Sequence, residues 1–447
     1  MNPKRVLLIG GNFSPELTGI GKYNGEMASW FAKEGIHCTV ITTFPYYPEW
    51  KVDAGYRKQS WFYRTERNNL AGKGSVHVYR CPHYVPKKPS GLKRMISDLT
   101  FFMSAFVQVF FSFFHKKYDV VIAVAPPFHV GFLALFYKWI TRTPMVYHIQ
   151  DLQIDAAKEL GMIRQKGLLN LMFRLEAFIL KRTDWVSSIS YGMIRRIGSK
   201  TEKEVVFFPN WVDMSGLYPL FDQTGLKSKF GFREEEKLVL YSGAIGEKQG
   251  LENILLAAME MKDENIRFAV CGSGPYKEKL RVMAEEGGLT NVSFLPLQPK
   301  ESFNDFLNAA DLHLVLQKAN ANDLVMPSKL TGILAVGGSA LVTAPEGSSL
   351  YNYISGHEIA TLAEPENLVS LVAGIRIALA DHNVKEIRSN AYSFANEYLN
   401  IEKVMPKFLA DLVPAGTQDV AKPSVKVTRQ PVQDVNRKEA FEKPLRA

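Results

Sequence analysis

A short turn in the second half of the chain combines the residue types that bind phosphate. An apolar, strand-like run leads into the sequence Ser-Gly-Ala-Ile-Gly-Glu-Lys-Gln-Gly at 242–250. Gly243 and Gly246 allow backbone amides to approach an anion closely, and a following helix adds the positive end of its dipole. Lys248 can neutralise a diphosphate there, and Gln249 belongs to the same candidate site. The alternative is that Lys248 is an ordinary exposed turn lysine.

Two further candidates for anion binding lie in the same half of the chain. Gly272 and Gly274 follow another apolar run, and a helix start is predicted at the sequence Met-Pro-Ser-Lys-Leu. Proline suits the first turn of a helix, serine can cap it, and lysine adds positive charge where the helix presents free N–H groups. The residues of this start are Pro327, Ser328, Lys329 and Leu330. One nucleotide-diphosphate pocket in the C-terminal half explains all three turns.

The first half of the chain also runs from an apolar strand into glycines, but it lacks a dinucleotide-binding motif. The spacing G-x-G-x-x-x-G begins only at Gly19, ten residues after the strand-like run ends at Ile9. No acidic residue closes the second strand either, so a nicotinamide enzyme is not favoured. A P-loop is excluded because no G-x-x-x-x-G-K-[ST] occurs. We expect the loop 12–21, with Gly21 and the adjacent Lys22, to form a lid over an interdomain cleft.

Strand-like runs alternate with helical patterns in both halves, which predicts two parallel sheets. In the first half the runs lie at 6–9, 38–43, 76–80, 120–125 and 145–149. In the second half they lie at 238–241, 268–271, 292–294, 312–316 and 340–343, and helical patterns follow at 368–380, 384–398 and 401–412. The predicted fold class is therefore α/β, with two Rossmann-like domains that face a cleft and a junction near Leu217.

Composition indicates the compartment and the kind of partner. The chain has 447 residues, 46% of them hydrophobic, and a formal net charge of +9, which favours an anionic partner such as a nucleotide diphosphate, a membrane surface or nucleic acid. No nucleic-acid-binding module is recognisable. Cys38, Cys81 and Cys271 have neither metal-ligand nor disulfide spacing, and a reducing cytoplasm is expected. No export signal is expected, because the first apolar run is too short.

A phenylalanine-rich run at 99–114 is too short and too polar to favour a membrane span. It contains Ser104, Gln108 and Ser112. The basic residues that flank it are Lys87, Lys88, Lys93, Arg94, Lys116 and Lys117. It is therefore either a helix packed on the sheet or an interfacial helix that dips into a bilayer, and both alternatives stay open.

Several motifs together resemble the retaining glycosyltransferases of family 4, which have the GT-B fold. The motifs are SPELTGIGKY at 14–23, PYYP at 45–48, HIQD at 148–151, FFPNW at 207–211, YSGAIGEKQGLE at 241–252 and PSKLT at 327–331. Within that family they look like the colanic acid biosynthesis glycosyltransferases, which are often described as fucosyltransferases. The resemblance covers nearly all of residues 1–412.

The resemblance implies a domain plan and a reaction. An N-terminal acceptor-binding domain (1–216) and a C-terminal nucleotide-sugar-binding domain (217–395) would be followed by a crossover helix (396–413) that returns to the first domain. The polar segment 414–447 is expected to be a disordered tail. A sugar would pass from a nucleotide donor, with GDP-fucose favoured, to a polyprenyl-diphosphate-linked saccharide in exopolysaccharide synthesis. The expected place is the cytoplasm, with peripheral contact at the inner face of the membrane, and no cofactor is implied.

The chain departs from the wider family at positions that relatives use for the donor. Relatives commonly carry arginine and lysine in the phosphate turn, where this chain has Ala244 and Gln249. Of the expected pair of glutamates, Asp323 is a rough substitute for the first and Gly332 takes the place of the second. Gln150 stands where many relatives have a histidine. These departures bear on which residues hold the donor.

The resemblance also suggests how the reaction would run. The acceptor would attack from the face on which the diphosphate departs, and the diphosphate would receive its proton. Lys248 and Lys329 would stabilise the leaving diphosphate, and Asp151 is the candidate acidic group near the reacting centre or for orienting the acceptor. His148, on the same strand face as Gln150, is interpreted as a core histidine. Because no D-x-D motif or compact His/Asp/Glu cluster occurs, we expect a metal-independent reaction.

Two functions of other classes stay open. One is a non-catalytic relative that binds a nucleotide-sugar or a glycan and serves as an assembly partner. The other is a sugar-nucleotide epimerase on the same scaffold, although nothing here resembles the paired acidic and histidine residues of such enzymes. A transferase consumes its donor only with acceptor or water, an epimerase converts the sugar without releasing nucleotide, and a binding protein does neither.

Overall fold

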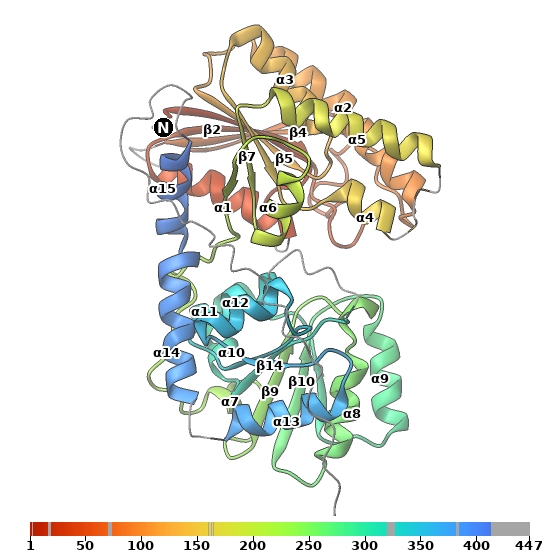
Figure 1. Ribbon diagram of the computed structural model, residues 1–447, viewed down its shortest axis with the longest axis vertical. Helices are drawn as coiled ribbons and strands as arrows, with labels where there is room; N and C mark the ends of the chain where they lie inside the picture. Colours follow the sequence, from red (N-terminus) through yellow and green to blue (C-terminus); the bar gives the residue numbers. More distant parts are fainter. Residues whose placement is uncertain are drawn as a thin grey trace, which may run out of the picture. The chain divides into compact units, whose positions relative to one another are not determined.

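The computed structural model describes residues 1, 3–16, 19–69, 74–159, 161, 163, 165–319, 327–380 and 384–412. Residues 1–412 form one compact unit, which contains two sheets with helices on both faces of each (Figure 1). We call the part around the first sheet the N-lobe and the part around the second the C-lobe. The expected tail lies outside the described residues, and the expected domain boundaries stay a prediction.

The N-lobe sheet has eight strands in the order β3-β4-β2-β1-β5-β6-β7-β8. They are β1 (Arg5–Gly10), β2 (His37–Thr43), β3 (Arg64–Asn69), β4 (Ser75–Cys81), β5 (Val120–Ala125), β6 (Met145–Ile149), β7 (Trp185–Ser188) and β8 (Val205–Phe207). Neighbouring strands are parallel except β3, which runs antiparallel to β4. Every residue of β5 is buried, as expected of a central parallel strand covered on both faces.

Helices cover the two faces of the N-lobe sheet. They are α1 (Gly19–Lys33), α2 (Gly91–Ser112), α3 (Val130–Thr141), α4 (Gln153–Glu159), α5 (Lys166–Arg182) and α6 (Tyr191–Gly198). Side chains alternate along β1, so Val6 and Leu8 pack in the core under α1 while Leu7 and Ile9 pack in the core under α2 and α3. The carboxyl ends of the parallel strands therefore meet at one edge, where side chains in the following loops come together.

The C-lobe sheet has six parallel strands in the order β11-β10-β9-β12-β13-β14. They are β9 (Lys237–Ser242), β10 (Ile266–Cys271), β11 (Val292–Leu295), β12 (Leu312–Val315), β13 (Ala340–Thr343) and β14 (Thr361–Ala363). The helices of this lobe are α7 (Leu226–Lys229), the short 3-10 helix η1 (Glu247–Gln249), α8 (Glu252–Glu260), α9 (Lys277–Glu286), α10 (Lys300–Asn308), α11 (Ser328–Ala335), α12 (Ser349–His357) and α13 (Leu368–Leu379).

The last helices connect the two lobes, which confirms the crossover. α14 (Val384–Phe394) and the π-helical turn η2 (Ala395–Leu399) contribute to the core of the C-lobe, while α15 (Ile401–Asp411) contributes to the core of the N-lobe. The ring of Phe408 in α15 stacks on Phe208, with the centroids 3.7 Å apart. These helices are drawn in blue in Figure 1. Successive helices, separated by the extended residue Asn400, thus anchor both lobes.

All ten strand-like runs of the sequence are strands, but four strands were not in those runs. Val205–Phe207 confirms a strand that the sequence predicts before the Pro-Asn turn at 209–210, whereas Trp185–Ser188 has four residues and the edge strand Arg64–Asn69 is polar throughout. The short strand Thr361–Ala363 has three residues. Polar or very short edge strands lack the apolar run that identifies a strand from sequence.

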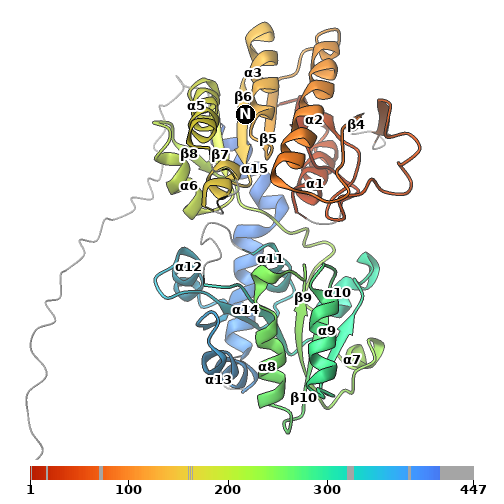
Figure 2. The ribbon, with the colours of Figure 1, turned by 90° about the vertical axis from the view of Figure 1, so that its right-hand side faces the viewer.

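α2 contains the phenylalanine-rich run and is longer than predicted. Among the described residues it is the one helix long and apolar enough to cross a membrane by length and composition. It lies beside α3 (Figure 2) and packs on the sheet through a stripe with near-helical spacing. The buried residues of this stripe are Ser97, Phe101, Ala105, Val109 and Ser112. The inner half of the helix is therefore part of the N-lobe core.

Candidate functional site

The turns after β9 and β10 lie against each other at the carboxyl edge of the C-lobe sheet. The two strands are parallel neighbours and pair Ser242 with Cys271. Beyond the strands, the amide of Gly243 donates to the Cys271 carbonyl at 3.0 Å, and that of Ile245 to the Ser273 carbonyl at 2.9 Å. The strand pairing thus continues into the two glycine-rich turns.

Gly272 and Gly274 have a packing reason to be glycine. A Cβ at Gly272 would lie 1.9 Å from the carbonyl oxygen of Gly243, and one at Gly274 would lie 2.1 Å from that of Ile245. Both distances are far inside van der Waals contact, so the backbone of the first turn occupies the place of a side chain. The expected contact of these two glycines with a donor stays a prediction.

Gln249 holds the turn after β9 in shape. Its Oε1 accepts a hydrogen bond from the amide of Gly246 at 3.1 Å, across the short helix η1. Gln249 therefore has a structural role in the turn that needs no charge. Lys248 lies in η1, but its side chain is outside the part of the chain that the structure describes. Its expected role therefore stays a prediction.

Lys329, in the first turn of α11, reaches back to the turn after β9. Its Nζ donates to the Tyr241 hydroxyl at 2.8 Å and lies 4.0 Å from the centre of that ring. The hydroxyl in turn donates to the Ala244 carbonyl at 2.6 Å. A Cβ at Gly243 would lie 3.3 Å from Nζ. Lys329 is thus held in the cradle of the glycine turn by residues far away in the sequence.

No acidic side chain of the described residues contributes to the pKa of Lys329. Burial alone lowers its pKa to about 7, because the ammonium loses water and gains only a neutral phenol. The first turn of α11 also presents backbone N–H groups that no side chain of the described residues caps, although the amide of Leu330 already donates to the Pro327 carbonyl at 2.9 Å. An anion placed there would raise the pKa of Lys329, so that the lysine is protonated, and would itself be stabilised by the positive end of the helix dipole.

The structure corrects the expected role of Ser328. Pro327 takes the N-cap position and Ser328 is the first helical residue, so Ser328 does not cap the helix. Its carbonyl instead accepts a hydrogen bond from the Thr331 hydroxyl at 2.8 Å. Leu330 is fully buried and packs in the C-lobe core. Of the four residues at this helix start, Lys329 is the one that brings a charged group to the turn.

Gly19 and Gly21 lie in a helix and not in a loop. Gly19, Gly21 and Lys22 form the first turn of α1, so the end of the expected loop 12–21 is helical, while residues 12–16 lie outside helices and strands as expected. A Cβ at Gly21 would lie 2.4 Å from the Oε2 of Glu16. Lys22 pairs with Glu26, with Nζ 3.4 Å from Oε1. The cation at this turn therefore has an internal partner.

Glu16 fills the space beside α1 with a buried carboxylate. Its Oε1 accepts the amides of Tyr46 and Tyr47 at 3.0 and 2.9 Å, and its Oε2 accepts from Asn12 Nδ2 at 2.9 Å. Burial raises the pKa of Glu16, and these hydrogen bonds oppose the rise. The sequence analysis gave Glu16 no role, although it lies inside the quoted SPELTGIGKY motif.

Two side chains bring the candidate regions close together. Tyr23 in α1 of the N-lobe lies near Thr331 in α11 of the C-lobe, whose hydroxyl partly opposes the rise that burial causes in the pKa of Tyr23. Thr331 follows Lys329 by two residues, and Tyr23 follows Lys22 directly. The first turns of α1 and α11 thus belong to one neighbourhood.

Three polar residues at the end of β6 differ in burial and in hydrogen bonding. His148 is buried, with Nδ1 3.0 Å from the Ser187 hydroxyl, and burial lowers its pKa to about 3, which confirms a core histidine. Gln150 is 6% exposed, and its Nε2 has no hydrogen-bond partner within the described residues. Asp151 is exposed in the following loop. Gln150 therefore offers a free donor at the carboxyl edge of the N-lobe sheet.

A carboxyl group on α2, which the sequence analysis missed, lies near the same edge. Asp98 Oδ2 accepts from Gln153 Nε2 at 3.1 Å, and the Asp98 carbonyl lies 3.0 Å from His129 Nε2. Burial raises the pKa of Asp98 to about 6. The available signal was a lone acidic residue in an otherwise apolar and basic helix.

The described residues hold no group of three or more His, Cys, Asp or Glu side chains arranged to bind a metal ion. Asp323, the rough substitute for a donor-binding glutamate, lies outside the described residues. The acidic groups at the two edges are thus separate, and each is engaged by hydrogen bonds or faces solvent.

Family models match both halves of the chain. A model described as "Glycosyl transferase 4-like domain" matches residues 18–211, and one described as "Glycosyl transferases group 1" matches residues 222–394. The chain is 40% identical to the colanic acid biosynthesis glycosyl transferase WcaI of Escherichia coli (strain K12), over 91% of this chain and 99% of that protein.

Solved structures with the same two-lobe fold cover nearly the whole chain. Sucrose-phosphate synthase from Thermosynechococcus elongatus aligns with a TM-score of 0.69 at 16% identity, covering 92% of this chain and 99% of its own. Anabaena Alr3699/HepE in complex with UDP and glucose aligns with a TM-score of 0.63 at 13% identity, covering 92% and 100%. At such identities the likeness shows the fold alone.

Proposed function

This chain belongs to the glycosyltransferases of the GT-B fold, as its motifs predicted, and we propose that it moves a sugar from a nucleotide donor to a lipid-linked saccharide in the synthesis of a colanic acid-like exopolysaccharide. The proposal of this pathway is supported by the relative that is 40% identical and named for colanic acid biosynthesis. We further propose the family 4 reaction with retention of configuration, and GDP-fucose as the donor.

The observation that carries the proposed donor site is the ammonium of Lys329. It is buried next to the glycine turn after β9, its pKa is lowered to about 7, and its hydrogen bond goes to the neutral Tyr241 hydroxyl. The diphosphate of a nucleotide-sugar would supply the missing negative charge, and the free N–H groups of α11 would bind its oxygens. The structure of Alr3699/HepE with UDP supports a nucleotide at a fold of this type.

Charge stabilisation is the catalytic task of this arrangement. When the bond between the sugar and the diphosphate breaks, negative charge grows on the leaving oxygen. Lys329 and the first amides of α11 are fixed before the reaction, so they stabilise the developing charge without reorganisation. Lys248 is proposed to add a second positive charge. The leaving diphosphate then takes the proton of the attacking hydroxyl, and the reaction is proposed to need no metal ion.

The proposed acceptor side is the carboxyl edge of the N-lobe sheet. Asp98 and Gln153 form a hydrogen-bonded pair there, and Gln150 has a free amide donor among the described residues. Such groups suit the hydroxyls of a saccharide, which both donate and accept hydrogen bonds. Asp151 is proposed to lie near the reacting centre or to orient the acceptor. The proposed place of the reaction is the cytoplasmic face of the membrane.

The departures in the phosphate turn do not require a non-catalytic protein. Gln249 bonds the amide of Gly246 and so keeps the turn closed, while Lys329 brings a positive charge to the same turn from α11. The loss of charge at two positions of the turn is therefore offset by a lysine from another element. This favours a transferase over an assembly partner that only binds.

Product analysis tests the proposed function. The purified protein is given GDP-fucose, UDP-glucose and UDP-galactose, each with and without a polyprenyl-diphosphate-linked saccharide, and released nucleotide and new glycan are measured. We expect one donor to be consumed only with acceptor, with retained configuration, and with no loss on addition of a chelator. The Lys329→Met variant should be inactive, while Lys407→Met, at an exposed position on α15, should keep full activity.

Sugar conversion without released nucleotide would instead identify an epimerase. Nucleotide binding without consumption of any donor, with a range of lipid-linked acceptors, would support the assembly partner and contradict the proposed transfer.

A further inference from the structure

The outer half of α2 is an exposed apolar face. Its largest members, which are 48% to 75% exposed, are Leu92, Leu99, Met103, Phe110, Phe111 and Phe114, the last just beyond the helix. The opposite half is buried in the N-lobe core through Phe101, Ala105 and Val109. Exposed phenylalanines on one side of a helix cost free energy in water and mark a surface that meets another apolar phase.

A neighbouring segment extends this apolar face. Trp61 is 82% exposed and Phe62 is 74% exposed. The next residue, Tyr63, donates its hydroxyl hydrogen to the Ser104 carbonyl of α2 at 3.0 Å, which holds the segment beside the helix. Trp and Tyr are the side chains enriched where a membrane meets water, because one end is apolar and the other is polar.

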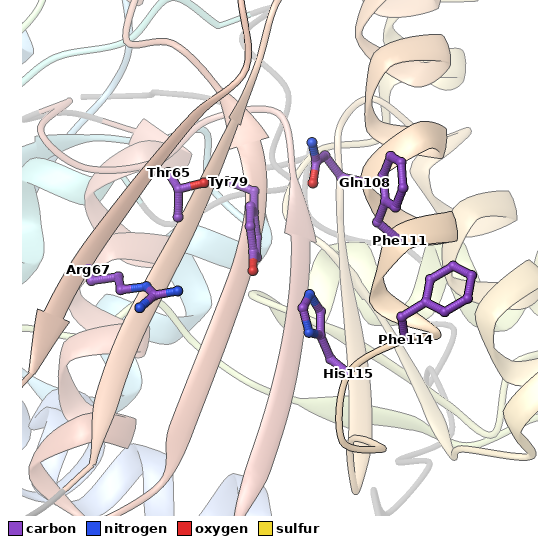
Figure 3. A pocket seen from close by; sticks show the side chains of 7 residues that line it. All are labelled: Thr65, Arg67, Tyr79, Gln108, Phe111, Phe114 and His115. Atoms are coloured by element: carbon purple, nitrogen blue, oxygen red, sulfur yellow. The ribbon is translucent and has the colours of Figure 1, made fainter.

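A pocket of about 850 Å³ opens at the carboxyl end of α2. Figure 3 shows Thr65, Arg67 and Tyr79 from β3 and β4 on one side, with Gln108, Phe111, Phe114 and His115 on the other. Arg67 is exposed and makes no ion pair with the described residues around it. The Tyr79 and His115 rings stack with their centroids 6.5 Å apart. The pocket therefore combines a free guanidinium with phenyl rings, which is suited to a phosphate attached to an apolar chain.

The charges around the apolar face are positive. Lys93 and Arg94 lie in its first turn, and Lys116 and Lys117 follow its end. The acidic Asp98 is bonded on the inner side, to Gln153. Basic residues that flank an apolar helix attract anionic lipid headgroups.

We propose that α2 and the segment 61–63 lie in the interface of an anionic phospholipid bilayer, with α2 parallel to the membrane plane, and that the pocket at its end binds the phosphate of a lipid headgroup. α2 lies on the bilayer and does not span it, because its inner stripe belongs to the N-lobe core. The inference deepens the proposed function: membrane binding serves the reaction because the proposed acceptor is lipid-linked. Asp98, on the inner side of the same helix, then brings the acceptor edge close to the membrane.

Vesicle flotation of the full-length protein tests this proposal without any donor or acceptor, so its failure is distinct from failure of the proposed transfer. The vesicles are pure phosphatidylcholine, or phosphatidylcholine mixed with phosphatidylglycerol. We expect strong binding to the mixed vesicles, and roughly tenfold weaker binding for Phe110→Ser/Phe114→Ser, which removes two rings from the interface. The matched control Val369→Ser/Ile377→Ser removes exposed apolar side chains from α13 of the C-lobe and should bind like the unchanged protein.

The pocket is tested separately with Arg67→Gln, which should weaken binding to mixed vesicles several-fold, because the headgroup phosphate loses its guanidinium partner; unchanged binding would contradict the phosphate site. Inorganic phosphate should compete only weakly, because it lacks the apolar chain that contacts Phe111 and Phe114. Equal binding of the apolar variant and its control would overturn the proposal. So would a dimer, measured by light scattering without vesicles, that Phe110→Ser/Phe114→Ser dissociates, since the face would then bind a second copy.

Discussion

The two lobes begin with the same local pattern, a strand followed by glycines and a helix, yet they treat negative charge in opposite ways. In the N-lobe the space beside α1 is filled by the carboxylate of Glu16, which accepts the amides of Tyr46 and Tyr47. In the C-lobe the space beside α11 contains the ammonium of Lys329, bonded to a neutral hydroxyl. The N-lobe turn carries its own anion, and the C-lobe turn is built to receive one.

A glycine-rich turn in a sequence therefore indicates backbone that can approach an anion. It does not indicate whether that anion is a bound ligand or a carboxylate of the protein. Free amides and a helix dipole attract a carboxylate of the protein as readily as a phosphate. What separates the two cases is the balance of charged side chains. Lys22 pairs with Glu26 in the N-lobe, while burial lowers the pKa of Lys329 in the C-lobe because no acid offsets it.

The largest effect is expected from removing the cation of the C-lobe turn. Lys329→Met should weaken the binding of the preferred nucleoside diphosphate about 100-fold, or roughly 3 kcal/mol, because the diphosphate loses a buried charge-assisted hydrogen bond. Lys22→Met, the matched change in the N-lobe, should change nucleotide affinity less than threefold. Both are measured by titration calorimetry. Equal losses in the two variants would contradict the contrast between the lobes.

The Lys329→Met variant should lose nucleotide affinity without losing stability. Burial lowers the pKa of Lys329 below its value in the unfolded chain, so this lysine costs folding free energy below about pH 10, and most below about pH 7. Removing it should leave the free energy of unfolding at pH 7 unchanged or higher, as urea unfolding can show. A strongly destabilised Lys329→Met would mean that the lysine serves the fold.

A severe loss of stability is expected where the two C-lobe turns touch. Gly272→Ala places a Cβ 1.9 Å from the Gly243 carbonyl oxygen and should lower the free energy of unfolding by about 2–4 kcal/mol. Gly167→Ala, in α5, meets no atom within 4 Å and should be neutral or slightly stabilising. Thermal unfolding compares them. If Gly272→Ala unfolds like the unchanged protein, the two turns do not pack as described.

The internal anion of the N-lobe should matter for stability and not for the donor. Glu16→Ala leaves the amides of Tyr46 and Tyr47 without their acceptor and should cost about 2–3 kcal/mol of unfolding free energy. Glu16→Gln keeps one acceptor oxygen and should cost less. The folded variants should bind nucleotide normally. A selective loss of nucleotide affinity in Glu16→Gln would place Glu16 in the donor site and remove the contrast.

The smallest effect is expected from the group that positions the cation. Tyr241→Phe removes the hydroxyl that holds Lys329 Nζ and should weaken nucleotide binding about fivefold, or roughly 1 kcal/mol. The double variant with Lys329→Met should bind no more weakly than Lys329→Met alone, because the two groups act through one contact. Additive losses would show that Tyr241 acts independently of Lys329.

Much of the fold follows from sequence because central parallel strands are apolar on both faces. β1 and β9 are continuous apolar runs, and such runs can be recognised without any knowledge of their neighbours. The edge strand Arg64–Asn69 could not be recognised, because its residues are all polar and its pairing with β4 is made by the backbone. The crossover of α15 came from the family resemblance, which the packing of Phe408 confirms.

The site was predictable as a set of turns but not as a set of contacts. The sequence identifies Lys329 at a helix start, whereas its partner Tyr241 lies 88 residues earlier and meets it only through the order of the strands. Ser328 was expected to cap α11, but Pro327 precedes it and takes the cap position. Glu16 could not be recognised as an internal anion, since an acid beside glycines looks the same when it is exposed to solvent.

The most direct test of the central claim is proton uptake on nucleotide binding at pH 8. The preferred nucleotide among GDP, UDP, ADP and dTDP is titrated into the protein in buffers of different ionisation enthalpy. With a pKa of about 7, Lys329 is mostly neutral in the free protein at this pH, and the bound diphosphate, which is already fully ionised, should recharge it. We predict uptake of about 0.9 proton per nucleotide, and almost none in Lys329→Arg, which is always charged. Binding without proton uptake in the unchanged protein would contradict the claim that the diphosphate binds beside Lys329 at the C-lobe turn.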